Sequence, residues 1–333
     1  MKGKYWQGFI FVAGLAVGLA VFWFLLMREG VATVGANLER FGLWPLLGFV
    51  AISLINFCLY TKRWQMIVNA QLPANEQVGF GRIYLHRLAG YATGYLTPGT
   101  QIAGEPVRVA LHVADGVPAK VATSAAVIDI AFDIMAFVVF VVAGMLLAVI
   151  SGLSSDSTLM IFLGLGFALG LMIIFFWAIG TGRGFFQHFF RLIGLSKIKR
   201  LHRWEEGLIQ TEALMSNFLA AKPWRILRLS VISAIAISFK VVEVFYIAWF
   251  FGVQLTFAQA FLVSTLPGIT LLLPVPGGLG LFEGGFATIF TLLAIPLNPI
   301  SFTLIIRLRD AIFIAIGVTH LSIQGGKIYA KKS

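Results

Sequence analysis

Two short stretches decide the predicted fold: TPGTQIAGEPVRVAL at Thr97–Leu111 and LPVPGGLGLFEGG at Leu273–Gly285. Each contains a Pro-Gly pair, at Pro98 and at Pro276, and each carries a glutamate seven positions after that proline. Pro-Gly pairs interrupt helices because proline lacks a backbone donor and glycine is flexible. The apolar run before each break is too short to cross a bilayer, which takes about 20 helical residues. We therefore interpret the two stretches as the tips of two matching re-entrant hairpins that meet inside a membrane.

The composition places the whole chain in a membrane. Of the 333 residues, 59% are hydrophobic and 12% are charged, which is more apolar than a soluble domain of this size needs. The single cysteine, Cys58, excludes a disulfide framework or a cysteine-based metal site. The net charge of +11 lies beside hydrophobic runs, so it indicates topology rather than binding of nucleic acid. We expect an all-α polytopic membrane protein that is not an enzyme and that holds no cofactor or metal.

Six segments are long and apolar enough to cross ~30 Å of hydrocarbon as helices. They are Tyr5–Met27, Leu43–Tyr60, Val121–Ser151, Leu159–Thr181, Ile226–Phe251 and Ile300–Ile323. Amphipathic rings prefer the membrane interface, and five tryptophans fall near the ends of these segments: Trp44, Trp64, Trp177, Trp224 and Trp249. The two hairpins lie between the spans, at residues 79–118 and 257–298, and each opens on a Gln-x-x-Phe signal.

Basic residues gather on one side of the predicted membrane. They precede the first span, follow the second and the last, and fill a loop at residues 183–225. The members outside that loop are Lys2, Lys4, Lys62, Arg63, Arg82, Lys327, Lys331 and Lys332. Because basic loops stay in the cytoplasm, both termini are predicted to be cytoplasmic in the cell membrane. The basic loop also contains Phe, Leu and Ile, which is typical of an amphipathic helix on the membrane surface; docking of a partner is the alternative.

The hairpins are expected to enter from opposite faces, because the first starts from the basic side and the second from an uncharged loop. The chain then divides into two halves, 1–151 and 158–326, followed by a basic tail at 327–333. Each half reads span, span, hairpin, span. Inverted repeats with interrupted helices are a recurring architecture of transporters, in which the site lies near the midplane.

Charged groups inside hydrocarbon cost ~2.5–3.5 kcal/mol on insertion scales, so each needs a partner or a function. The candidate path for a substrate consists of Pro98, Gly99, Glu105, Arg108, Pro276, Gly277, Gly278, Glu283, Arg87, Asp129, Asp133, Lys240, Glu243 and Arg307. Arg309 and Asp310 are further intramembrane charges. Because acids and bases occur in similar numbers, a purely structural network of ion pairs is the alternative interpretation.

Glu105 and Glu283 have the strongest claim to function, because the same placement occurs twice. A helix that starts after a break points its positive dipole end at the membrane centre, where it attracts an anionic head group or a carboxylate. Arg108 lies on the same helix face as Glu105 and is suited either to bind phosphate or to pair with that glutamate. Each glutamate can also simply complement its own helix.

The remaining titratable residues leave several interpretations open. Asp129 and Asp133 share one helix face and can form a proton relay, a metal site or a counter-charge for Arg307 or Lys240. The three histidines in or near the helices, His86, His112 and His320, have no metal-ligand spacing and are expected to be incidental. The glycines after Pro276 follow no strand, so dinucleotide binding is rejected. The aspartate pair also resembles the acidic motif of membrane prenyltransferases, but no second acidic motif is present.

The two motifs resemble those of one family. Pro-Gly-Thr-Gln-Ile-Ala-Gly-Glu-Pro-Val-Arg and Pro-Val-Pro-Gly-Gly-Leu-Gly-Leu-Phe-Glu-Gly-Gly are similar to the flippase-like transmembrane domain of lysyl-phosphatidylglycerol synthase and its stand-alone relatives. The resemblance covers about residues 5–325. It implies movement of a lipid head group between leaflets, and it assigns roles to Glu105, Arg108, Pro276, Gly277, Gly278 and Glu283. The family's usual doubled glycine is Ala103-Gly104 here, which should slightly change helix packing.

We expect a lipid translocase that moves a lipid with a polar or anionic head group without ATP, either downhill or coupled to protons. The stand-alone relatives accompany lipid-linked sugar and hopanoid pathways, and any lipid head group would be synthesised by a separate protein. An ion-coupled carrier of a small anion and, with less support, a prenyltransferase-like enzyme are the alternatives. The sequence indicates a membrane-lipid partner and no nucleic acid, and it leaves the oligomeric state open.

Overall fold

The computed structural model describes residues 23–97, 101–150, 202–221, 223–267 and 278–330, with single positions at 166, 169–170, 173–174, 177 and 275. Regular structure in these residues is helical, and no strand occurs among them. The long helices are α3 (Leu43–Asn69), α6 (Ala119–Ile150), α10 (Pro223–Phe250) and α13 (Pro299–Ala330). The shorter ones are α2 (Val31–Phe41), η1 (Ala74–Glu76), α4 (Phe80–Leu96), η2 (Gln101–Gly104), α5 (Glu105–Ala114), α9 (His202–Ala221), α11 (Phe257–Thr265) and α12 (Leu281–Leu292).

Four of the six predicted spans form the long helices. At 1.5 Å per residue, the 27 residues of α3 reach ~40 Å, which exceeds the ~30 Å of a hydrocarbon core. In the described part of the chain, three helices are both long and apolar enough to cross a membrane: α3, α6 and α10. α13 is as long as α6 but carries charged residues along its length. The first and fourth predicted spans lie mostly outside the described residues, although residues 23–29 are helical.

Each predicted hairpin contains two short helices separated by a break. α4 and α5 form the first, and α11 and α12 form the second. α4 begins at Phe80 and α11 at Phe257, which are the phenylalanines of the two Gln-x-x-Phe signals. The residues at the centres of the breaks, Pro98, Gly99, Pro276 and Gly277, lie outside the described residues.

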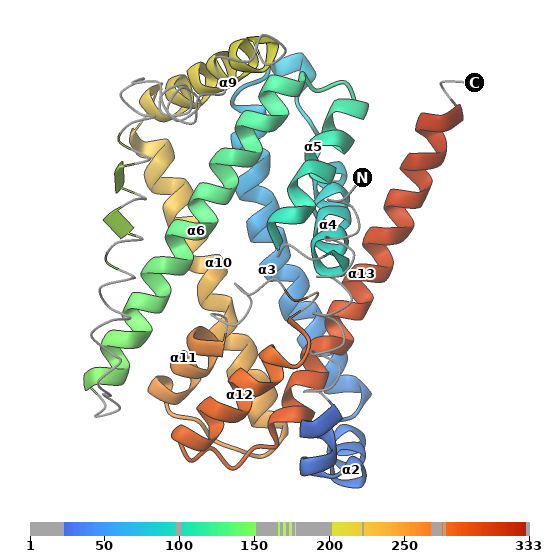
Figure 1. The fold of residues 1–333 in the computed structure, drawn as a ribbon, viewed down its shortest axis with the longest axis vertical. Coiled ribbons are helices and arrows are strands. Elements are labelled where there is room, and N and C mark those ends of the chain that lie inside the picture. The colour runs from blue at the N-terminus through green and yellow to red at the C-terminus, as the bar shows by residue number, and fades with distance from the viewer. Residues whose placement is uncertain are drawn as a thin grey trace.

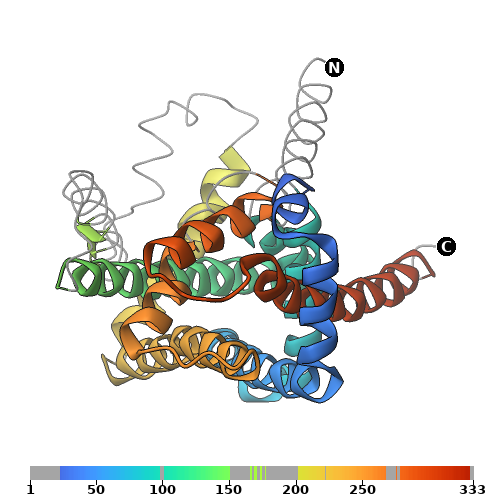
Figure 2. The ribbon, with the colours of Figure 1, turned by 90° about the horizontal axis from the view of Figure 1, so that it is seen from below.

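The two hairpins lie in opposite halves of the molecule. Figure 1 shows α4 and α5 beside the upper part of the long helices, and α11 and α12 beside the lower part. The first hairpin packs through α4 along α13, and the second packs through α11 against α6. Each hairpin therefore contacts the last long helix of the other half of the chain. α3 and α10 lie side by side and complete the bundle, as the view along its axis shows (Figure 2).

Glycines bring each hairpin into contact with its long helix. A Cβ atom at Gly317 of α13 would lie 2.3 Å from the carbonyl oxygen of Leu88 in α4. One at Gly144 of α6 would lie 2.7 Å from Oγ1 of Thr265 in α11. Real Cβ atoms do not approach other atoms so closely, so a larger residue at Gly317 would clash with backbone and one at Gly144 would have to displace the side chain of Thr265. Small residues at helix contacts are the usual route to close packing in membranes.

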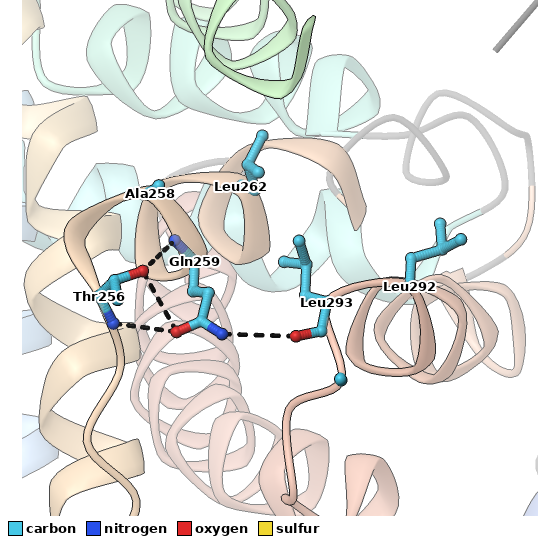
Figure 3. Close-up of a pocket in the computed structure, with 7 residues that line it drawn as sticks. Thr256, Ala258, Gln259, Leu262, Leu292 and Leu293 are labelled. Atoms are coloured by element: carbon cyan, nitrogen blue, oxygen red, sulfur yellow. Dashed lines mark hydrogen bonds between the residues drawn. The ribbon is translucent and has the colours of Figure 1, made fainter. Parts of the chain in front are cut away.

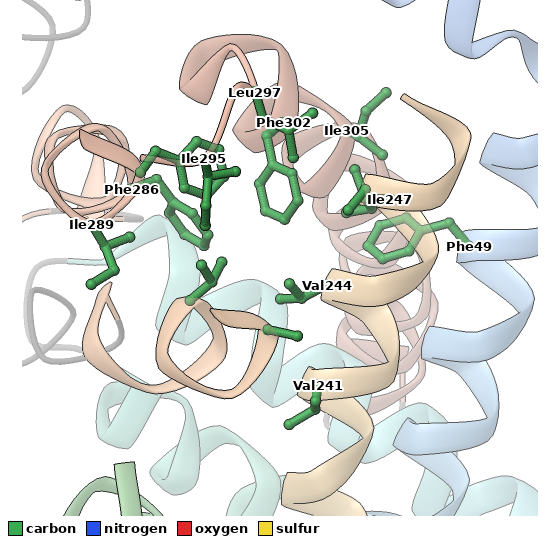
Figure 4. Packing of buried hydrophobic residues seen from close by; sticks show 14 of the residues in the cluster. Phe49, Val241, Val244, Ile247, Phe286, Ile289, Ile295, Leu297, Phe302 and Ile305 are labelled. Carbon is green, nitrogen blue, oxygen red and sulfur yellow. The ribbon is translucent and has the colours of Figure 1, made fainter. Parts of the chain in front are cut away.

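An aromatic and aliphatic cluster holds the second hairpin in place. Figure 4 shows its side chains converging from α3, α10, α12 and α13. Phe302 lies at its centre, with ring centroids of Phe286 and Phe290 at 5.1 and 5.3 Å. Such ring pairs contribute ~0.5–1.5 kcal/mol beyond burial of area. Without a hydrophobic effect inside lipid, contacts of this kind are what fix helix positions.

The helix at the end of the basic loop contacts the protein directly. α9 packs against α6 and α10, and it buries Met215, Phe218 and Leu219. These side chains join Trp64 and its neighbours in a second cluster. The rest of the loop that was predicted to lie on the membrane surface is outside the described residues. α13 continues to Ala330, so Lys327 of the predicted tail lies within a helix.

Candidate functional site

Asp129 is the centre of a buried ion-pair network in which four helices meet. Its carboxylate accepts hydrogen bonds from three arginines: Arg63 of α3 at 2.8 Å, Arg87 of α4 at 2.9 Å and Arg108 of α5 at 2.9 Å. The side chains of Asp129 and Arg63 are fully buried. Guanidinium groups cannot be deprotonated in proteins, so all three arginines remain charged.

Two further carboxylates balance these arginines. Asp133, one turn along α6, lies 2.7 Å from Nη2 of Arg63 and 3.5 Å from Nη2 of Arg87. Glu105, the first residue of α5, pairs with Arg108. We call the six residues Arg63, Arg87, Arg108, Glu105, Asp129 and Asp133 the Asp129 network. Its formal charges sum to zero, which is what a low-dielectric site requires.

Arg309 organises a second network, which we call the Arg309 network. It joins α13 to α3, α4 and α10. Its guanidinium contacts Glu243 of α10 at 3.1 Å and Asp310 at 2.8 Å. Ser53 of α3 donates to Glu243 at 2.6 Å, and Tyr91 of α4 donates to Asp310 at 2.8 Å. The hydroxyl of Tyr91 thus binds the first hairpin to a charged residue on a helix of the second half of the chain.

The two hairpins share one arginine. Arg307 of α13 donates from Nε to Oε1 of Glu283 at 2.9 Å, and its Nη2 lies 2.8 Å from the same oxygen. It also donates to the hydroxyl of Tyr95, near the end of α4. The other oxygen of Glu283 accepts the backbone N–H of Gly280 at 2.8 Å and caps its own helix. The residues beside the two breaks therefore meet at Arg307, as expected if the hairpin tips come together.

Lys240 lies near these networks without belonging to them. Its Nζ is 5.8 Å from the centroid of Phe137 on α6, a cation–π distance. No carboxylate in the described part of the chain lies within ion-pair distance of it. Glu243, three residues later on α10, is engaged by Arg309 instead.

The structure brings several of the predicted site residues together, and it gives Asp129 and Asp133 partners other than Arg307 and Lys240. The structure brings Arg87, Arg108, Glu105, Asp129 and Asp133 together and joins Glu283 to Arg307. Asp129 and Asp133 were offered as counter-charges for Arg307 or Lys240, but they pair with arginines of the first half of the chain. Those arginines lie on adjacent helices, whereas Arg307 is held by Glu283. Gly278 adopts a φ of 61°, which favours glycine.

Arg63 was predicted to follow the second span and Trp64 to lie near its end, but both lie within α3. The helix continues through them to Asn69, and both side chains are fully buried. The ring of Trp64 is buried within the protein, and its centroid lies 3.7 Å from the guanidinium carbon of Arg108. The continuation is physically possible because two aspartates neutralise Arg63. With Arg63 added, the candidate intramembrane charges comprise six cations and six carboxylates. The cations are Arg63, Arg87, Arg108, Lys240, Arg307 and Arg309, and the carboxylates are Glu105, Asp129, Asp133, Glu243, Glu283 and Asp310.

The packing of α5 on α4 explains the Ala103-Gly104 pair. A Cβ atom at Gly104 would lie 1.9 Å from the carbonyl oxygen of Gly90 in α4, so this glycine is required. Ala103 is only half-buried and accommodates its methyl group. Gly90 also makes room for Arg108, whose Cγ would lie 2.4 Å from a Cβ at that position. The two glycines let α4 and α5 approach closely around the arginine.

Two pockets are lined by residues outside the charged networks. One, of about 350 Å³, is lined by Thr256, Gln259 and the end of α12 (Figure 3). There Thr256 and Gln259 cap α11 reciprocally, and Gln259 donates to the carbonyl of Leu293 at 3.4 Å. A larger pocket, of about 680 Å³, lies between residues 25–29, α12 and the start of α13. Among the described residues, no group of three or more His, Cys, Asp or Glu side chains is arranged to hold a metal ion.

Comparison with known proteins identifies the family. The model of the lysylphosphatidylglycerol synthase TM region matches residues 11–317, which is nearly the whole chain. The chain therefore belongs to this family and is an integral membrane protein with a function connected to membrane lipids. No curated protein matches it, and no solved structure matches it.

Proposed function

We propose, from membership of this family and from the charged networks, that the chain is a lipid translocase. It moves a lipid with a polar or anionic head group between leaflets without ATP, while the acyl chains remain in the bilayer. It performs no chemical reaction on the lipid, and a separate protein synthesises the head group. We place it in the cell membrane with both termini in the cytoplasm, as the distribution of basic residues predicts.

One observation carries this proposal: the helix that follows each break has an acidic residue in its first turn, and an arginine pairs with that residue. Glu105 at the first break pairs with Arg108, and Glu283 at the second pairs with Arg307. Irregular backbone at membrane depth is tolerated only where it is buried in protein or lines a cavity. A bundle that served only as an anchor would need neither the breaks nor the charges.

The contacts between helices support an inverted repeat. The first hairpin packs on the last helix of the second half, and the second hairpin packs on the last helix of the first half. In transporters with this architecture, one repeat rocks against the other around a site at the midplane. We propose that the site lies between the Asp129 network and Arg307, because Tyr95 and Glu283 bring the two hairpins together there.

An anionic head group has identifiable binding partners in this site. Arginine recognises phosphate by two parallel hydrogen bonds, and Lys240 supplies a point charge that is not held in an ion pair within the described residues. A lipid phosphate that replaces Glu105 beside Arg108, or Glu283 beside Arg307, leaves the local formal charge unchanged when the displaced carboxylate takes up a proton. Exchange of partners with protonation then allows passage without leaving an isolated charge in hydrocarbon.

The test is movement of a head-group-labelled anionic lipid in vesicles that contain the purified protein. The combined substitution of Glu105→Gln and Glu283→Gln removes both carboxylates and should slow lipid movement by about tenfold or more, the effect of losing a charge-assisted contact. The matched control is Glu39→Gln with Glu76→Gln, two exposed glutamates outside the networks. If the first variant moves lipid as fast as the parent, the site assignment is wrong. Uptake of a small anion without any lipid substrate would favour the ion-coupled carrier instead.

A further inference from the structure

One helix of the first hairpin carries a continuous stripe of polar side chains. Glu105, Arg108, His112 and Asp115 follow one another at spacings of three, four and three residues, which places them on one face of α5 and its C-terminal cap. Asp115 lies at the end of α5 where its side chain is partly exposed, whereas Arg108 and His112 are buried. The stripe therefore leads from the surface to the Asp129 network.

Two histidines lie at the middle of this stripe in direct contact. Nδ1 of His86 in α4 is 2.6 Å from Nδ1 of His112. One nitrogen must donate and the other accept at this distance, so the two rings share a proton. Nε2 of His86 lies 3.3 Å from Oδ2 of Asp115, whose side chain is 17% exposed, so the pair is within reach of a carboxylate that extends to the surface.

Aromatic rings and charged groups surround the histidine pair. The ring of His112 stacks on Trp64 at 4.4 Å between centroids, and Arg108 covers that same indole. His320 of α13 lies against His86, with ring centroids 5.4 Å apart. The charged and titratable groups that face the pair are thus Asp115 and Arg108 of α5, Arg82 of α4 and His320 of α13.

Beyond the histidines, the stripe continues as buried polar atoms. Nε2 of His112, Nε of Arg108 and Oε2 of Glu105 have no hydrogen-bond partner within the described residues, although all three are buried. Buried polar atoms in this situation are normally satisfied by ordered water. Water that bridges these atoms would join His112 to Glu105 along one side of α5.

We propose that Asp115, His86 and His112 form a proton-uptake path that delivers protons from the surface to Glu105. A proton from bulk water passes by Asp115 to Nε2 of His86, the shared Nδ1 proton moves to His112, and Nε2 of His112 releases its own proton toward Glu105. Glu105 changes from a carboxylate to a neutral acid. Each ring holds one proton before and after the step, and rotation of the two rings restores the starting tautomers. No oxidant, reductant or other co-reactant is needed.

The consequence is coupling of proton movement to lipid movement, and in this respect the inference depends on the proposed function. Neutral Glu105 no longer balances Arg108, so the Asp129 network gains one positive charge. That charge is compensated when an anionic head group replaces Glu105 beside Arg108. Loss of the proton restores the original pair and releases the lipid. His86 and His112 are positioning and relay residues in this scheme and do not touch the lipid.

The experiment measures proton and lipid movement in the same vesicles, which contain a pH-sensitive dye and a head-group-labelled anionic lipid. With one proton moved per lipid, a pH difference of one unit corresponds to 1.36 kcal/mol and should bias the lipid between leaflets by about tenfold. Acidifying the side on which Asp115 lies should accelerate lipid movement in the parent.

The informative variant is His112→Gln, which keeps a side chain of similar size but cannot relay a proton. Proton transfer by a positioned side chain is worth ~10²–10⁴-fold, so proton uptake should slow by at least about tenfold and the rate should lose its dependence on pH. His202→Gln, the same change at the start of α9, is the control. His86→Gln should match His112→Gln, because both belong to one path.

The possible results distinguish failure of the proton path from failure of the proposed function. If the parent moves lipid but ignores the pH difference, the proton path is wrong and the proposed function stands. If the parent conducts protons through His112 but moves no lipid, the path is correct and the proposed function is wrong. If His112→Gln retains the parental proton flux and pH profile, the relay is overturned. A variant that fails to fold is recognised by its melting curve, and His86→Gln then supplies the same test.

Discussion

Replacing Asp129 by asparagine should be among the most destabilising single changes in the Asp129 network. The side chain is fully buried and accepts hydrogen bonds from Arg63, Arg87 and Arg108, all from different helices. Asparagine has nearly the same size, so no cavity forms and the effect is electrostatic. The change leaves three guanidinium groups around an amide whose nitrogen is itself a donor.

The magnitude follows from the cost of breaking a buried ion pair, which is ~3–5 kcal/mol when one partner is removed. Here several arginines lose the same partner, so the upper part of that range is expected. Asp133→Asn is the matched control. Its side chain is 36% exposed, and both arginines that it contacts still have Asp129. Because Asp129 still neutralises these arginines, Asp133→Asn should cost clearly less than Asp129→Asn.

The chain carries its own reporter for this comparison. Cys58 is the one cysteine of the sequence and lies half-buried on α3, next to the helices that the network joins. A thiol-reactive dye that fluoresces on binding follows unfolding in detergent as Cys58 becomes accessible. A loss of 3–5 kcal/mol should lower the midpoint by ~5–10 °C or more, and the control should move by a few degrees at most. Equal midpoints for Asp129→Asn and Asp133→Asn would refute the account of Asp129 as the centre of the network.

Further substitutions test the close helix contacts, the helix cap and the shared arginine. Gly317→Ala places a methyl group against the carbonyl of Leu88 and should lower the free energy of unfolding by ~1–3 kcal/mol. The control is Gly81→Ala, whose methyl group meets no atom within 4 Å and should stabilise α4 slightly. The thermal midpoints of the two variants are compared. Thr256→Ala removes the reciprocal cap of α11 and should cost ~1 kcal/mol, seen as faster amide exchange at the start of that helix while α12 is unchanged. Arg307→Lys keeps the charge but loses the paired contact with Glu283, so lipid movement should slow by about tenfold while the protein remains folded; an unchanged rate would remove Arg307 from the proposed path.

The sequence was sufficient for the four long helices in the described part of the chain and for most of the buried charges. Hydropathy identified α3, α6, α10 and α13 because an apolar run of 20 residues has few other interpretations. The Gln-x-x-Phe signals located the starts of α4 and α11 to within a few residues. Glu105 and Glu283 were found because they repeat at the same distance from a proline. In each case the signal is local, so no partner had to be known.

Pairings between helices could not be read in the same way. Arg63 was predicted to follow the second span because a charge near the end of an apolar run normally marks the membrane surface. Its burial depends on Asp129 and Asp133, which lie on another helix. A tyrosine before it and a tryptophan after it were compatible with either reading. The contact between His86 and His112 likewise depends on how α4 meets α5, and glycines at two distant positions set that distance.

The balance of charges constrains how such a protein can work. Buried ion pairs are poor sources of stability, and apolar groups of the same shape are often at least as good. Six carboxylates and six cations in one bundle therefore need a reason other than stability, and exchange of partners with a charged substrate provides one. A network whose charges already sum to zero would gain a net negative charge if it bound an anion. Binding therefore requires that one of its own carboxylates is neutralised first. Glu105 is suited to that step because one of its oxygens has no hydrogen-bond partner within the described residues, and its other oxygen holds only Arg108. A proton at Glu105 and a lipid phosphate at Arg108 then become alternatives that satisfy the same balance.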